Sequence, residues 1–241
     1  MGVSALFDSL LDILFPPRCL GCASLGKEIF CANCLAGINY IDLCCQKCGR
    51  PFAGSFRNSL CSDCRSQTPP FDIARSAAIY EGALKEAIHK FKFGGKMSLS
   101  GPLSKLFADR LSAGHFDRVL EGIDMVTMVP LYNKRQKERG FNQAEVLAQA
   151  AANYLKLDPA EHVLLRTRNT RPQFDLKREE RFANVEGAFE VGRGTLVRGK
   201  SILLIDDIFT TGATVCECSK ALKDAGAKRV AVLTLARAIE D

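Results

Sequence analysis

The chain has 241 residues, 47% of them hydrophobic and 25% charged, and its formal net charge is +6. These proportions are ordinary for a globular protein with an ample core, and they exclude a low-complexity chain. Nearly all of the basic excess lies in residues 134–200. A positive field there suits a polyanion such as a pyrophosphate or a nucleic-acid backbone, although a solvated face is the alternative.

The first predicted element is a short amphipathic helix over residues 1–17, where Leu6, Leu10, Ile13 and Leu14 share one helical face. The segment has no basic leader and two aspartates interrupt it, which argues against a signal peptide. Its apolar run is also too short to cross a bilayer. We therefore expect no transmembrane segment and a cytoplasmic location.

Cysteines dominate the next segment, residues 18–68. Eight of them form four Cys-x2-Cys knuckles, which are Cys19 and Cys22, Cys31 and Cys34, Cys45 and Cys48, and Cys61 and Cys64. Without a secretion signal, this pattern indicates two structural zinc sites, each closed by four thiolates, although disulfides or free thiols are the alternative. The spacing leaves open which knuckles share an ion. Cys44 is an alternative to Cys45 as a ligand, but Cys45 gives the two-residue gap to Cys48.

After a linker at 66–71, strands and helices alternate over residues 72–241, which we expect to form one domain. Strands are predicted at 73–80, 124–130, 162–167, 202–205 and 229–236. Helices are predicted from Gly82 to before Gly94, and at 99–111, 143–155, 177–183 and 214–225. This alternation predicts an α/β fold with a mostly parallel sheet, right-handed crossovers and flanking helices.

Chemistry concentrates in the segment SILLIDDIFTTGAT, residues 201–214. Asp206 and Asp207 end a run of β-formers, and Thr210, Thr211, Gly212, Ala213 and Thr214 precede a helix. The backbone N–H groups of a helix N-terminus favour a phosphate, and paired carboxylates can accept hydrogen bonds from neighbouring hydroxyls. Together they suit a ribose 5-phosphate, whereas a plain strand with Thr210 or Thr211 as helix N-cap is the alternative.

Two basic segments can reach the same edge of the sheet. After strand 124–130 comes a loop with Arg135 and Arg139, which are able to clamp a pyrophosphate. Phe141 follows and either stacks on a base or staples the next helix. Arg178 and Arg181 lie in a later segment, where surface ion pairs with Glu179 and Glu180 are the alternative to ligand binding.

Residues 202–214 resemble the phosphoribosyl-diphosphate (PRPP) binding signature of type I phosphoribosyltransferases. The resemblance implies that Asp206 and Asp207 bind the ribose hydroxyls and that Thr210–Thr214 binds the 5-phosphate. It also implies a Mg²⁺ ion held mainly by ligand oxygens and water, since Mg²⁺ retains much of its hydration. Arg135 and Arg139 are the candidate catalytic residues.

The whole chain resembles the ComF/GntX family, in which a double zinc ribbon precedes a phosphoribosyltransferase-like domain. The motifs that carry this resemblance are the zinc knuckles, the segment RGFNQ at 139–143 and the PRPP signature. The family implies competence or DNA uptake, with single-stranded DNA and DNA-uptake machinery proteins as partners. An active phosphoribosyltransferase with an unidentified acceptor is the alternative, and an oxidative sensor built on the zinc thiolates is a third.

Overall fold

The computed structural model describes residues 18–26, 28–52, 59–93, 97–132, 136–137, 140–172, 176–192 and 197–239. The helix expected at residues 1–17 lies outside these ranges. In chain order the elements are α2 (Ala32–Ala36), α3 (Ser62–Ser66), β1 (Ile73–Ile79), α4 (Gly82–Phe93), η1 (Met97–Leu99), α5 (Ser100–Ser112), α6 (Asp117–Leu120), β2 (Met125–Met128), α8 (Gln143–Leu155), β3 (Leu164–Arg166), α9 (Arg178–Val185), β4 (Phe189–Val191), β5 (Ser201–Phe209), α10 (Ala213–Asp224) and β6 (Arg229–Arg237).

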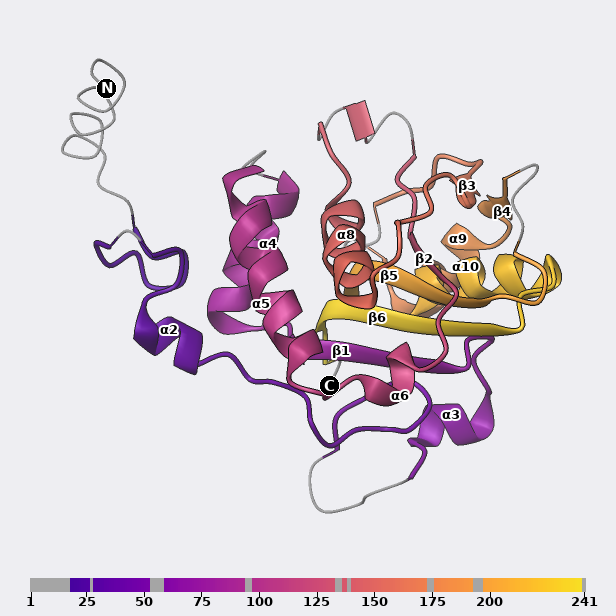
Figure 1. The fold of residues 1–241 in the computed structure, drawn as a ribbon, viewed down its shortest axis with the longest axis horizontal. Helices are drawn as coiled ribbons and strands as arrows, with labels where there is room; N and C mark the ends of the chain where they lie inside the picture. Colours follow the sequence, from indigo (N-terminus) through magenta and orange to yellow (C-terminus); the bar gives the residue numbers. More distant parts are fainter. Residues whose placement is uncertain are drawn as a thin grey trace.

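Four strands form a parallel sheet in the order β1-β6-β5-β2, with helices on both faces (Figure 1). The predicted α/β fold is therefore confirmed. Side chains of β5 alternate between the two faces: Leu203 and Ile205 join one buried cluster, while Ile202 and Leu204 join the other. Apolar residues at successive positions of β5 thus follow from its burial on both sides.

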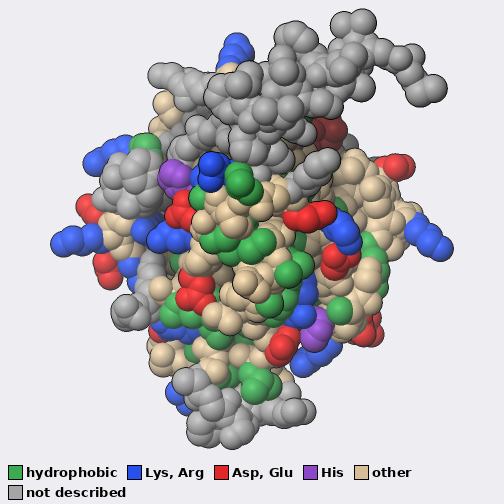
Figure 2. Space-filling model, turned by 90° about the vertical axis from the view of Figure 1, so that its left-hand side faces the viewer, with side chains coloured by type: hydrophobic (Ala, Val, Ile, Leu, Met, Phe, Trp, Pro, Cys, Tyr) green, Lys and Arg blue, Asp and Glu red, His purple; other side chains and the backbone are tan. Residues whose placement is uncertain are grey.

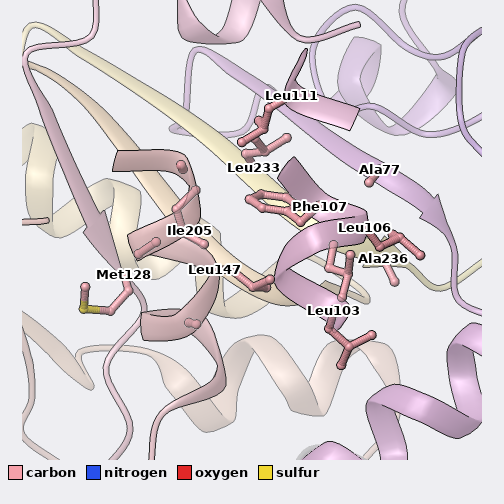
Figure 3. Close-up of a cluster of buried hydrophobic side chains, with 14 of the residues drawn as sticks. Ala77, Leu103, Leu106, Phe107, Leu111, Met128, Leu147, Ile205, Leu233 and Ala236 are labelled. Atoms are coloured by element: carbon pink, nitrogen blue, oxygen red, sulfur yellow. The ribbon is translucent and has the colours of Figure 1, made fainter. Parts of the chain in front are cut away.

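The first buried cluster joins α4, α5 and α8 to one face of the sheet. Figure 3 shows Phe107 of α5 and Leu147 of α8 beside Ile205 and Leu233 of the sheet. The second cluster covers the opposite face with residues of α10, the β3–β4 pair and Cys45, Cys48, Cys61 and Cys64. These four cysteines are therefore part of the core.

The cysteine-rich segment also covers the edge strand β1. The N–H of Ile79 donates to the carbonyl of Asn39 at 2.8 Å, and that of Ala74 donates to Lys47 at 2.7 Å. Tyr40 forms an antiparallel bridge with Ala78. An exposed strand edge invites pairing with other chains, and this contact removes that exposure.

Two elements differ from expectation. β5 runs through both aspartates to Phe209, four residues beyond the predicted end, because it pairs with β6 along its whole length. The strand predicted at 162–167 forms, but as β3 it pairs antiparallel with the unpredicted β4 in a separate two-stranded sheet. In both cases, pairing with another strand determined the structure that the segment adopts.

On the face shown in Figure 2, basic and acidic side chains are interspersed around apolar ones, so the uncovered part of this face carries no field of a single sign. None of the helices in the described ranges combines the length and the apolar character needed to cross a membrane.

Candidate functional site

The four knuckles pair as neighbours. The sulfur atoms of Cys19, Cys22, Cys31 and Cys34 form the first cluster and those of Cys45, Cys48, Cys61 and Cys64 form the second; within each cluster they lie within 4.8 Å of one another. The structure thus answers the question of pairing that the spacing left open. Cys44 belongs to neither cluster of the described chain.

Both clusters fit a tetrahedral zinc ion. With Zn–S bonds of about 2.3 Å, the sulfurs of a tetrahedron lie about 3.8 Å apart. The distance from Cys22 Sγ to Cys31 Sγ is 3.7 Å, and that from Cys48 Sγ to Cys61 Sγ is 3.6 Å. Each cluster supplies four thiolates, which leaves no open position on the metal, so these are two structural zinc sites.

The two clusters share one backbone design. In each cluster, the N–H of the third cysteine donates to the sulfur of the first. The N–H of Cys31 donates to Cys19 Sγ and that of Cys61 to Cys45 Sγ, both at 3.3 Å. The Cys31 N–H is the largest of several backbone donors that lower the pKa of Cys19 to about 6. Zinc binds the thiolate, so these N–H groups prepare the ligand.

Burial distinguishes the clusters. All four ligands of the second cluster are at most 7% exposed, whereas Cys22 of the first is exposed. The first cluster sits on α4: Gly21 leaves no space for a side chain against Ala83, and Lys90 Nζ donates to the Leu20 carbonyl at 3.4 Å. Both clusters therefore brace the α/β domain, the second from inside its core.

The acidic pair lies near the carboxyl end of β5, at the edge of the sheet where ligands bind in such folds. Asp207 is buried, and its Oδ1 lies 2.8 Å from Nζ of Lys92 on the last turn of α4. The Asp207 N–H donates to Asp206 Oδ1 at 2.9 Å. The sequence pattern did not indicate that Lys92 belongs to this site, although Lys92 lies just before the predicted end of its helix.

Asp206 lies in surroundings that disfavour its charged form. Burial and the adjacent Asp207 charge raise the pKa of Asp206 to about 7, and Lys92 offsets only part of this effect. An acid with such a pKa, at the edge of a sheet where a ligand can bind, is a functional candidate on physical grounds.

The segment after β5 turns tightly into α10. Gly212 is the residue before the helix and has φ +85, while Thr211 Oγ1 accepts the N–H of Ala213 at 3.3 Å. Thr211 thus accepts the hydrogen bond expected of an N-cap side chain, although the N-cap is the next residue, Gly212. The first turn of an α-helix presents N–H groups that have no partner within the helix, which gives this loop the character of an anion site.

Gly212 is required by both conformation and space. A Cβ at this position would lie 2.6 Å from the ring of Phe209. We expect Gly212→Ala to lower the free energy of unfolding by about 2–4 kcal/mol, since it combines a left-handed backbone with a clash. Urea unfolding would measure this loss. Gly101 lies in α5, and a Cβ added there would meet no neighbouring atom within 4 Å. Gly101→Ala should therefore leave stability unchanged or raise it slightly; equal stability of the two variants would contradict the argument.

Phe209 is itself held by the second cluster. The Arg237 guanidinium lies 4.1 Å from the Phe209 ring centroid and donates to the Cys48 carbonyl at 2.7 Å. Phe71 meets the same ring edge-on at 6.2 Å between centroids. A chain of contacts therefore runs from a zinc ligand through Arg237 and Phe209 to the loop at Gly212. Sequence reasoning missed Arg237, because no local pattern marks such a contact.

Phe141 and Gln143 fix the last turn of α4. Phe141 is buried and packs on Phe91 with ring centroids 4.9 Å apart, so it staples the helices and is not a free stacking surface. Asn142 caps α8 by accepting the Ala144 N–H, and Gln143 donates to the Phe91 carbonyl. These contacts hold the turn that carries Lys92. Arg135 and Arg139 lie outside the described residues.

The later basic segment connects to the second cluster. Arg178 on α9 contacts Asp63 Oδ2 at 2.6 Å, and Arg50 contacts the same oxygen at 3.3 Å. Asn184 accepts the Arg171 N–H and donates to its carbonyl, which closes the loop before α9. Arg178 thus pairs across to the cysteine-rich segment, not with Glu179 or Glu180 as the surface alternative expected.

Comparison with known proteins agrees with this architecture. Residues 10–65 match the double zinc ribbon domain family and residues 142–241 match the phosphoribosyl transferase domain family. The chain is 30% identical to DNA utilization protein YhgH of Escherichia coli (strain K12), over 90% of this chain and 93% of that protein.

Two further relatives carry the name of competence proteins. Competence protein F of Haemophilus influenzae is 28% identical over 92% of this chain and 97% of its own. Competence protein ComFC of Bacillus subtilis is 31% identical over 87% and 85%. With two zinc clusters ahead of a parallel sheet that ends in an acidic pair and a threonine-rich loop, and with matches along nearly the whole length, the chain belongs to the ComF/GntX family.

Proposed function

We propose that the protein binds PRPP or a related phosphoribosyl ligand with Mg²⁺ at the end of β5, and that it serves DNA uptake by handling single-stranded DNA. The observation that carries the first part is one arrangement: Asp206 and Asp207 next to Lys92, followed directly by the Thr210–Thr214 loop at the start of α10. In this arrangement the carboxylates can accept hydroxyl groups, Lys92 is a cation and the loop can bind an anion. A phosphoribosyl ligand requires these three features together.

Each part has a chemical role in this proposal. Asp206 and Asp207 accept hydrogen bonds from the two ribose hydroxyls, and Thr210–Thr214 with the α10 N-terminus binds the 5-phosphate. Lys92 supplies positive charge on the pyrophosphate side, with Arg135 and Arg139 as further clamps. Mg²⁺ when bound neutralises the pyrophosphate, held mainly by ligand oxygens and water.

The cellular role rests on the relatives. Two of them are named competence proteins and one a DNA utilization protein. We extend that role to this chain, with single-stranded DNA and DNA-uptake proteins as partners and the cytoplasm as its location. The basic excess of residues 134–200 supports binding of a polyanion.

A phosphoribosyltransferase activity is the second candidate, favoured by the position of Lys92. A cation beside the carboxylates is where pyrophosphate would leave, and its charge stabilises that departure more than the ground state. Pyrophosphate release from PRPP in the presence of bases or DNA distinguishes the two. Turnover supports the enzyme, whereas tight binding without turnover supports a binding protein.

We expect PRPP with Mg²⁺ to bind the wild type, and Asp206→Ala or Asp207→Ala to weaken binding about 10- to 100-fold. Each variant loses hydrogen bonds to a charged group, worth about 1.5–3 kcal/mol. Isothermal calorimetry measures the affinity. Asp109→Ala removes an exposed carboxylate on α5 and serves as the matched control; wild-type affinity in both site variants would refute the assignment.

A further inference from the structure

A cavity of about 410 Å³ lies between the second cysteine cluster, α9, α10 and the end of β6. Its volume is within the roughly 300–1,000 Å³ of small-molecule sites. Thr210 and Thr211 line it, while Asp206, Asp207 and Lys92 are not among its described lining residues. The cavity therefore adjoins the phosphate loop and lies apart from the acidic pair, so it is a site of its own.

The lining is rich in cations. Arg50, Arg178, Arg237 and Lys220 contribute to it, against the two acids Asp63 and Glu217. Lys220 is exposed, and no ion pair joins it to another residue of the described ranges. Arg50 and Arg178 converge on a single oxygen, Asp63 Oδ2, at 3.3 and 2.6 Å. Two guanidinium groups already stabilise an anionic oxygen at the cavity wall.

The lining also has an aromatic surface. Phe182 on α9 lines the cavity and is 40% exposed. Phenylalanine side chains are more often buried, so this exposed ring is unusual. Phe71 and Phe209 also line the cavity and are buried, so they add apolar surface to it. An open ring stacks on any nucleobase, whichever its identity. A planar apolar face with cations and hydroxyls around it matches a base linked to a phosphate.

From this combination we propose that the cavity binds one nucleotide unit, with its base against Phe182 and its phosphate toward Arg178 and Lys220. A free mononucleotide and a unit of a single strand share this chemistry. The proposal rests on the proposed function, because it locates where a DNA-handling protein would hold its strand. Asp63 opposes an incoming phosphate and keeps the two arginines in place.

The test measures binding of a labelled single strand of about 12 nucleotides by fluorescence anisotropy, a length within the roughly 4–16 nucleotides of single-strand binding sites. Phe182→Leu should weaken binding at least about fivefold through lost stacking. Lys220→Gln should weaken it about two- to fivefold and reduce the salt slope by about one. Asp63→Asn should tighten binding several-fold, because it removes the opposing charge.

Matched measurements keep the outcomes separate. Lys105→Gln removes an exposed lysine on α5 that pairs with Asp109, and it should bind as the wild type. Zinc content and PRPP affinity are measured for every variant, and both should be unchanged. Competition by unlabelled AMP supports a site that accepts a free nucleotide, whereas competition only by unlabelled strand supports the strand.

Wild-type strand affinity in both Phe182→Leu and Lys220→Gln would overturn the cavity assignment, and PRPP binding would then still stand by its own measurement. Weaker strand binding in Asp63→Asn would also overturn it, since an asparagine oxygen can still accept from both arginines and only the charge that opposes a phosphate is lost. If the wild type binds neither strand nor AMP, the cavity proposal and the DNA part of the proposed function fail together.

Discussion

Replacing Cys61 with serine is expected to abolish cooperative folding of the entire chain. The ligands of the second cluster are at most 7% exposed and share a buried cluster with Phe71, Phe209 and Val230 of the α/β domain. Zinc binding of about 10–16 kcal/mol per site is as large as the whole stability of a typical domain, about 5–15 kcal/mol. Thermal unfolding and bound zinc per chain would measure the effect.

Two other cysteines provide the comparison. Cys22→Ser removes an exposed ligand of the first cluster, so we expect one zinc to be lost with a smaller destabilisation, about 1–3 kcal/mol, from the apolar contacts on α4. Cys44→Ser alters a cysteine outside both clusters and should retain both ions. Equal losses of stability in Cys22→Ser and Cys61→Ser would show that the two clusters do not differ in this way.

Both zinc sites also support the candidate ligand site. The first rests on α4, whose last turn carries Lys92, and the second reaches Phe209 through Arg237. Lys92 and Gly212 therefore depend on contacts that begin at opposite halves of the cysteine-rich segment. The two clusters thus contact, from two sides, the elements that carry the residues around the acidic pair.

Local patterns in the sequence predicted much of this. The cysteine spacing predicted the members of both four-cysteine clusters, and apolar periodicity predicted the helix Gln143–Leu155 with its observed bounds. The acids and threonines after a run of β-formers marked the candidate site. In each case neighbouring residues carry the physical signal, through ligand spacing, helical period or the turn into a helix.

What the sequence could not reveal depends on contacts between distant residues. Lys92 meets Asp207, and Arg237 meets Cys48, only after the sheet has assembled. The knuckles pair with their sequence neighbours, but the Cys-x2-Cys spacing alone fits neighbouring and alternating pairs equally. β5 continues through two carboxylates that disfavour a strand locally, because the ladder to β6 and burial outweigh that preference.

The Asp206 carboxylate should make stability fall as pH rises toward and through 7. Its pKa is about 7 in the folded chain, against an ordinary value of 3.8. Between these values the folded chain holds a proton that the unfolded chain has released, so the stabilising contribution is complete below pH 4 and is lost as pH rises through 7. From pH 6 to 8.5 this group alone should cost about 1.4 kcal/mol.

Asp206→Asn isolates this effect. An asparagine oxygen can still accept the Asp207 N–H, so the variant should lose the slope and exceed the wild type by about 2–4 kcal/mol at pH 8.5. Urea unfolding at pH 6, 7 and 8.5 measures both quantities, at pH values where the zinc thiolates persist. Asp109→Asn, an exposed carboxylate, should keep the wild-type slope.

The same variant should lose affinity for PRPP, because a neutral amide is a weaker acceptor for the ribose hydroxyls than a carboxylate. A gain in stability together with a loss of binding would show that Asp206 destabilises the fold but is needed to bind the ligand. If wild type and Asp206→Asn unfold with the same pH slope, Asp206 is ionised throughout the range. The raised pKa assigned to Asp206 would then be wrong.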